Sequence, residues 1–125
     1  MNYNVNKMDI VCNPQLSQRL KAAGINQESY FYWEKTETSW ICVPMILMNH
    51  NREHISAYTA SELIAMLPAY LKPPRKTERC TYIYEKQGRA WEFKTVCDAL
   101  ADMILFLINN NFTTEKQIND EYEQH

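Results

Sequence analysis

Apolar and polar positions alternate in two stretches of the chain, and each alternation is interrupted by a polar segment. Residues 30–43 read YFYWEKTETSWICV, and residues 82–93 read YIYEKQGRAWEF. Aromatic and β-branched residues on both sides of a polar, turn-prone segment are typical of a β-hairpin. Gly88 gives the second turn a permissive backbone. The pattern therefore predicts two hairpins.

An apolar helical pattern follows each hairpin. Thr59 and Glu62 have the spacing of a capping box at the start of the first helix, and Pro68 marks its end. Thr95 and Asp98 repeat the spacing at the start of the second helix. A hairpin–helix unit thus occurs twice, at about 28–71 and about 80–111. We interpret this as an internal repeat; the alternative is a coincidence of common strand and turn residues.

The two ends of the chain have different patterns. Asn13 is suited to cap a short N-terminal helix, Pro14 to begin it and Gly24 to end it. The last residues, 113–125, read TTEKQINDEYEQH and are polar throughout most of their length. We predict one domain over residues 1–112, followed by a polar and mobile tail over 113–125.

These elements predict an α+β fold. Neither hairpin–helix unit is large enough to bury its own apolar face, so the two units are expected to share one core. The predicted architecture is a short N-terminal helix and a four-stranded, mainly antiparallel sheet with helices packed on it. The last helix is apolar nearly all round from Val96 to Ile108, which favours the middle of the core; the alternative is a homodimer seam.

The first unit contains an insertion. Thr95 follows Trp91 by four residues, whereas Thr59 follows Trp40 by nineteen, so the first copy has about fifteen extra residues, including the loop 45–58. An insertion on a repeated scaffold is the first place to look for function. The predicted interaction loop contains His50, Asn51, Arg52 and His54.

The two histidines of this loop, His50 and His54, are four residues apart, which on a helix would suit a metal. The segment NHNREH is a poor helix former, however, and no third ligand is near it in the sequence. We therefore predict solvated loop histidines and no metal site.

Length, net charge and the lengths of the apolar segments limit the classes of protein that this chain can belong to. A chain of 125 residues with a net charge of −2 is one domain without a general field that would attract nucleic acid. The N-terminus has no apolar segment of signal-peptide length, and the longest apolar run, Met103 to Ile108, is too short to span a bilayer. The interpretation is a cytoplasmic protein that binds no membrane, with four scattered cysteines as free thiols.

Catalytic signatures are missing from the sequence. Gly24 and Gly88 are the only glycines, so there is no glycine-rich phosphate loop, and no nucleophile motif occurs. Cys97, in the first turn of the last predicted helix, is a nucleophile candidate because a helix N-terminus lowers a thiol pKa. No histidine is close to it in sequence, which favours a packed cysteine. No catalytic residue and no cofactor are predicted, and enzyme activity is not expected.

Alternating tyrosines suggest a second function. Tyrosines two apart lie on one face of a strand, and an open aromatic sheet face can stack the bases of single-stranded nucleic acid. A basic connector between the units would contact phosphates. The alternative is a structural role for the rings and a solvated linker. The residues concerned are Tyr30, Tyr32, Tyr82 and Tyr84 on the strands and Lys72, Arg75, Lys76 and Arg79 in the connector.

The segments SAYTASELIAMLP (56–68) and LADMILFLINN (100–110), together with the two aromatic hairpins, also support a resemblance. Over residues 10–112 the chain resembles small uncharacterised proteins encoded in prophages and mobile elements of gut bacteria. The resemblance implies an accessory protein of a mobile element and assigns no site residue. The leading hypothesis is a non-enzymatic interaction module that binds a protein, either itself or another chain.

Overall fold

The computed structural model describes residues 10–68, 74–78, 81–86 and 89–124, which form an α+β fold. In chain order the elements are α2 (Pro14–Ala22), β1 (Phe31–Lys35), β2 (Trp40–Pro44), the 3₁₀ helix η1 (Met45–Leu47), β3 (His54–Ala57), α3 (Ala60–Met66), β4 (Arg75–Lys76), β5 (Tyr82–Lys86), β6 (Arg89–Phe93), α4 (Val96–Asn109) and α5 (Glu115–Glu123).

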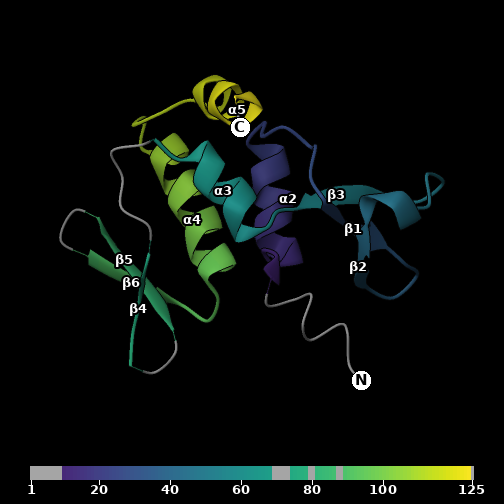
Figure 1. Ribbon diagram of the computed structural model, residues 1–125, viewed down its shortest axis with the longest axis horizontal. Coiled ribbons are helices and arrows are strands. Elements are labelled where there is room, and N and C mark those ends of the chain that lie inside the picture. Colours follow the sequence, from purple (N-terminus) through teal and green to yellow (C-terminus); the bar gives the residue numbers. More distant parts are fainter. Residues whose placement is uncertain (1–9, 69–73, 79–80, 87–88, 125) are drawn as a thin grey trace.

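Both predicted hairpins are confirmed, β1 with β2 and β5 with β6, and both are antiparallel. The single four-stranded sheet is wrong, because the described strands form two three-stranded sheets with the orders β2-β1-β3 and β4-β5-β6. Each hairpin uses the second edge of its first strand for a third strand, β3 or β4. The two sheets lie at opposite ends of the molecule, and helices α2, α3 and α4 stand between them (Figure 1).

Helix α2 has the ends that its sequence predicts. The Asn13 side chain accepts a hydrogen bond from the N–H of Leu16 at 2.8 Å, and Pro14 is the first helical residue. Gly24 has φ +92°, a conformation that glycine adopts without a steric penalty. The N–H of Ile25 then reaches back to the carbonyl of Leu20 at 3.1 Å, which completes a Schellman motif.

Helix α4 is the centre of the larger core, as predicted from its apolar pattern. It contacts α2, α3, β5 and β6, so most of its surface faces protein. Within the described part of the chain, none of the helices has the length and apolar character to cross a membrane. The buried residues of α4 are Cys97, Ala99, Leu100, Ala101, Met103, Ile104, Leu105 and Leu107.

The first sheet has a smaller core of its own. Trp33 is 3% exposed, and its indole N–H donates to the carbonyl of Cys12 at 2.9 Å. Phe31 and Trp40 pack against this cluster from the sheet. The buried members are Val11, Trp33, Cys42, Ile55 and Ala57.

The expectation of a mobile C-terminal tail is wrong for residues 115–123, which form helix α5. Thr114 caps the helix by accepting from the N–H of Gln117 at 3.2 Å. Ile118 is 1% exposed and belongs to the larger core. Asn119 donates from its side chain to the carbonyl of Gly24 at 3.0 Å. A polar helix that buries a narrow apolar stripe can pack on the fold although its average composition is hydrophilic.

Candidate interaction surface

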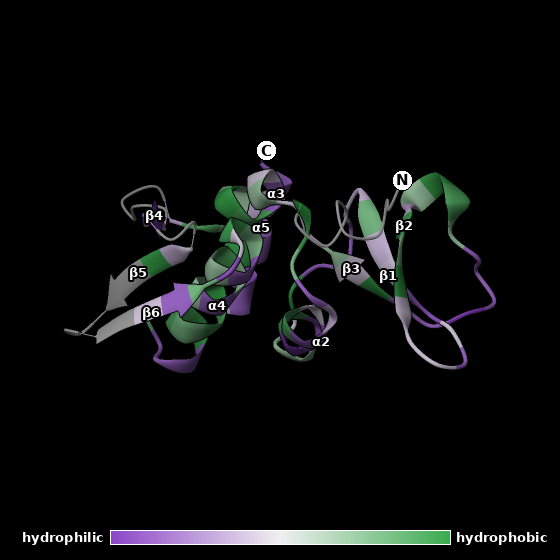
Figure 2. Cartoon of the chain, turned by 90° about the horizontal axis from the view of Figure 1, so that it is seen from below, coloured by the Kyte–Doolittle hydropathy of each residue, from purple (hydrophilic) through white to green (hydrophobic). Residues whose placement is uncertain are grey.

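The segment between β2 and α3, where the sequence predicts an insertion, forms η1, a turn and strand β3. The N–H of Met45 donates to the carbonyl of Tyr30 at 3.0 Å, so η1 begins beside the start of β1. Three side chains of η1 are exposed: Met45 by 53%, Ile46 by 86% and Leu47 by 69%, and Tyr30 beside them is 70% exposed. We call these four residues the apolar tip. Figure 2 shows η1 as a hydrophobic turn after β2, at the outer end of the molecule.

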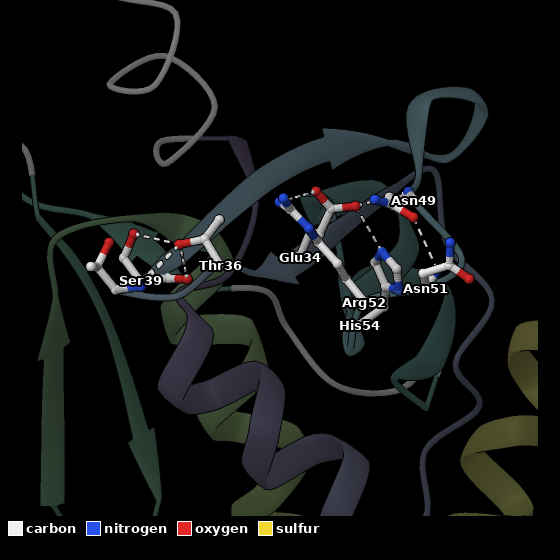
Figure 3. Close-up of polar contacts among 8 residues, drawn as sticks. Glu34, Thr36, Ser39, Asn49, Asn51, Arg52 and His54 are labelled. Atoms are coloured by element: carbon white, nitrogen blue, oxygen red, sulfur yellow. Dashed lines mark hydrogen bonds and ion pairs between the residues drawn. The ribbon is translucent and has the colours of Figure 1, made fainter.

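A buried carboxylate holds the loop that follows the tip (Figure 3). Glu34 accepts from the N–H of Asn49 at 2.8 Å, and the same oxygen is 3.0 Å from Nε2 of His54. Its other oxygen pairs with Arg52 at 3.4 Å. The Asn49 N–H, followed by His54, lowers the pKa of the Glu34 carboxyl. These contacts fix the loop between β2 and β3 on the sheet and thereby position the tip.

The predicted interaction loop is therefore divided. His50 and Asn51 are exposed in the turn, whereas Arg52 and His54 turn toward Glu34. The side chain of His54 is 12% exposed, so the expectation of a solvated loop histidine is wrong at this position. The reason is that His54 begins β3 and pairs with Glu34 on β1. Among the described residues, no three metal-ligating side chains gather.

A groove with a volume of about 710 Å³ lies beside the tip. Its walls come from the connection between α2 and β1, from β1 and η1, and from α3 and α5, which meet on one side of the molecule. Tyr30 and Met45 belong to both the tip and the groove. The lining residues are Asn26, Glu28, Ser29, Tyr30, Tyr32, Met45, Ser61, Glu62, Ala65, Tyr122 and Glu123.

Glu62 connects the elements around this groove. One carboxylate oxygen accepts from the N–H of Thr59 at 2.9 Å, which confirms the predicted capping box. The other accepts from the N–H of Tyr30 at 3.1 Å and lies 2.9 Å from the hydroxyl of Tyr122. Burial, followed by the neighbouring Glu62, raises the pKa of Tyr122, which therefore stays a neutral phenol. The cap of α3 thus also ties β1 and α5 to the groove.

The four candidate tyrosines do not share one face. Tyr32 is in β1 of the first sheet, and its hydroxyl donates to the carbonyl of Gln27 at 3.0 Å. Tyr30 directly precedes that strand. Tyr82 is in the second sheet and packs against the larger core. Tyr84 is in the same strand as Tyr82, and its side chain lies outside the described residues. The neighbouring strands that a common platform requires are not formed.

The basic connector is described in part. Arg75 and Lys76 form β4, pair with Ile83 and Tyr82 of β5, and are exposed. Lys72 and Arg79 lie outside the described residues. The two described cations are thus in the second sheet, at the other end of the molecule from the apolar tip (Figure 1).

The described cysteines, Cys12, Cys42 and Cys97, form no disulfide, as predicted, and all three are buried. Cys97 donates to the carbonyl of Ile10 at 3.2 Å, and burial raises its pKa to about 12. Burial also raises the pKa of Cys12 to about 11. A buried thiol with a raised pKa is a poor nucleophile at neutral pH, so the position of Cys97 at a helix start does not activate it. Cys80 lies outside the described residues.

Sequence reasoning identified the insertion as a candidate and missed the groove. Its lining residues come from separate segments that only the fold brings together. Comparison with family models, with curated proteins and with solved structures gave no match.

Proposed function

We propose that this protein is a non-enzymatic interaction module that binds a protein partner through the apolar tip and the adjoining groove. The observation that carries the proposal is the exposure of Met45, Ile46 and Leu47 in three successive positions. Single exposed apolar residues are common on protein surfaces, whereas a contiguous group marks an interaction site.

The energetics of the tip support this proposal. Full burial of one leucine, isoleucine or methionine side chain contributes about 1.5–3 kcal/mol. Ile46 is 86% exposed, so the fold gains little of this burial free energy from its side chain. A partner that covers the tip would bury these side chains on a turn already ordered by Glu34, so little additional conformational entropy would be lost.

The sequence pattern supplies the proposed context. In this proposal the two hairpin–helix units are an internal repeat, and the residues inserted into the first unit provide the binding surface. The resemblance to prophage and mobile-element proteins supports an accessory role in a bacterial cytoplasm. The partner is either a second copy of the chain or a different protein.

A comparison of variants tests the proposal. The native mass of the purified protein and its partners captured from bacterial lysate would be measured for wild type and for the double variant Ile46→Asp/Leu47→Asp. We expect the double variant to lose the partner, because two carboxylates would have to be buried in the interface. Ile64→Asp is the matched control, since Ile64 is 50% exposed on α3 and does not line the groove. Equal capture by the double variant and wild type would reject the tip as the binding surface.

A further inference from the structure

We infer that the groove binds a lysine or arginine side chain from an extended segment of the protein partner. This inference rests on the proposed function and deepens it, because it names the chemistry of the partner at one place. It concerns the groove beside the tip and does not require the tip residues Ile46 and Leu47.

The first support is the shape and lining of the groove. Tyr30, Tyr32 and Tyr122 line it together with Met45. Its volume of about 710 Å³ lies within the range of protein ligand sites. Lysine and arginine place a long apolar stem against such walls, and their charged groups are attracted to the faces of aromatic rings. The lining therefore suits a long cationic side chain better than a short or purely polar one.

The second support is the charge of the groove. Three lining residues are carboxylates, Glu28, Glu62 and Glu123, and the described lining includes no lysine, arginine or histidine. Glu62 is buried, with both of its oxygens bonded to groups of the protein. Glu28 and Glu123 are exposed, and neither takes part in the ion pairs found among the described residues. Two carboxylates at the groove are thus open to a cation, and the phosphates of a nucleic acid would be repelled.

The third support is the continuity of the groove with the tip. Tyr30 and Met45 line the groove and are also 70% and 53% exposed at the tip. A protein that covers the tip therefore reaches the groove without a gap. This favours a side chain of the same partner over a free small cation, since a small cation would gain no favourable contact from the apolar tip.

The experiment is a titration of the ¹⁵N-labelled full chain with four peptides that differ at one position. The peptides have the sequence Gly-Leu-Gly-X-Gly-Leu-Gly with blocked ends, and X is arginine, lysine, glutamine or glutamate. Backbone shifts of Tyr30, Ser61, Ala65 and Glu123 report the groove. We expect saturable shifts with arginine and lysine that weaken as salt is added, weaker binding with glutamine, and none with glutamate.

Variants in which amides replace carboxylates distinguish binding at the groove from general attraction between the peptide and the net charge of the protein. Glu28→Gln/Glu123→Gln should weaken binding of the arginine peptide about two- to tenfold, the range expected for two exposed ion pairs. Glu37→Gln/Asp120→Asn removes the same charge from positions that do not line this groove and should leave the affinity unchanged. Equal losses in both double variants, or equal binding of the arginine and glutamine peptides, would overturn the inference.

Two further outcomes identify what has failed. Spermidine binding as tightly as the arginine peptide would make the groove a site for small cations and would overturn the assignment to a partner segment. Absence of binding by every peptide, with capture still abolished by Ile46→Asp/Leu47→Asp, would overturn the inference and leave the proposed function intact. Binding of the basic peptides to the groove, with capture unaffected by those tip substitutions, would support the inference and reject the tip.

Discussion

Trp33 and Trp91 show how differently the two hairpins are supported. Trp33 is 3% exposed inside the small core of the first sheet, and its indole N–H bonds to Cys12. Trp91 is partly buried and packs against the larger helical core. The first hairpin carries a four-residue third strand, β3, whereas the third strand of the second sheet, β4, has two residues.

The comparison explains where the exposed surface lies. The segment between β2 and α3 supplies β3, and Ile55 and Ala57 of that strand help to close the small core. The outer edge of β3 is also covered, because Lys21 and Gln27 bond to its backbone. Helix α4 packs against β5 and β6 of the second sheet. The first sheet has its own small core and extends away from α4, and it carries the apolar tip. The segment between β2 and α3 thus adds buried residues to the small core and also presents the exposed apolar tip.

The largest expected effect is that of Trp33→Ala. Loss of a buried tryptophan destabilises a protein by about 3–5 kcal/mol, because a cavity remains and the Cys12 carbonyl loses the hydrogen bond from the indole N–H. Urea denaturation would measure the loss, and amide exchange should accelerate more in β1–β3 than in β5 and β6. Trp40→Ala is the control, with a smaller effect expected because Trp40 is only partly buried. Equal acceleration in both sheets would contradict a separate core under the first sheet.

Leu100→Ala tests the second region. Leu100 is fully buried in α4, so we expect a loss of about 2–5 kcal/mol in the free energy of unfolding. Amide exchange should accelerate in β5, β6 and the helices, which share this core. Ile64→Ala provides the matched change at an exposed helical position and should shift stability by less than about 0.5 kcal/mol. Retention of exchange protection in β5 and β6 would show that the second hairpin does not depend on α4.

The two helix caps allow a smaller and more local comparison. Glu62→Ala removes an acceptor that serves Thr59, Tyr30 and Tyr122, so we expect a loss of about 1–3 kcal/mol and faster amide exchange in α5. Asp98→Ala changes the equivalent cap position of α4, where the carboxylate accepts from the N–H of Asn13 at 2.8 Å. This variant should leave exchange in α5 unchanged, whereas similar exchange in both variants would argue against a link between Glu62 and α5.

The smallest effect concerns the pH dependence of the loop that carries the tip. The folded-state pKa of Glu34 is lowered by the Asn49 N–H and by His54, so its stabilisation is present above the unfolded pKa of the carboxyl. It is lost as the pH falls through the lowered folded-state value. The difference in unfolding free energy between wild type and Glu34→Gln should therefore shrink on acidification. A difference that stays constant across the pH range would contradict the prediction.

Local signals predicted much of the fold. Asn13, Pro14 and Gly24 defined α2, and the apolar pattern from Val96 onward placed α4 in the core. The pairing of strands was not predictable in the same way, since β3 and β4 are too short to give a clear alternation. Because β3 and β4 were not predicted, the two hairpins were expected to pair with each other in one four-stranded sheet.

The C-terminal helix and the groove were missed for different reasons. Thr114 and Gln117 have the spacing of a helix cap, and Ile118 and Tyr122 are one turn apart, so a signal for α5 was present. The mostly polar composition of residues 113–125 led to the prediction of a tail in place of this helix. The groove had no comparable signal, because its walls are distant in sequence. Of its lining, sequence reasoning singled out only Tyr30 and Tyr32 as candidate binding residues.

The attachment of α5 has a consequence for the order of events during protein synthesis. Asn119 bonds to the backbone of Gly24 and Asn26, and Tyr122 to that of Glu28, across sequence separations of 93 to 95 residues. The residues of the apolar tip are synthesised well before α5, which supplies the last wall of the groove. The apolar tip of the nascent chain is therefore present before the acidic groove beside it is complete. At that stage, a chaperone that binds exposed apolar residues would meet the tip without the finished groove beside it.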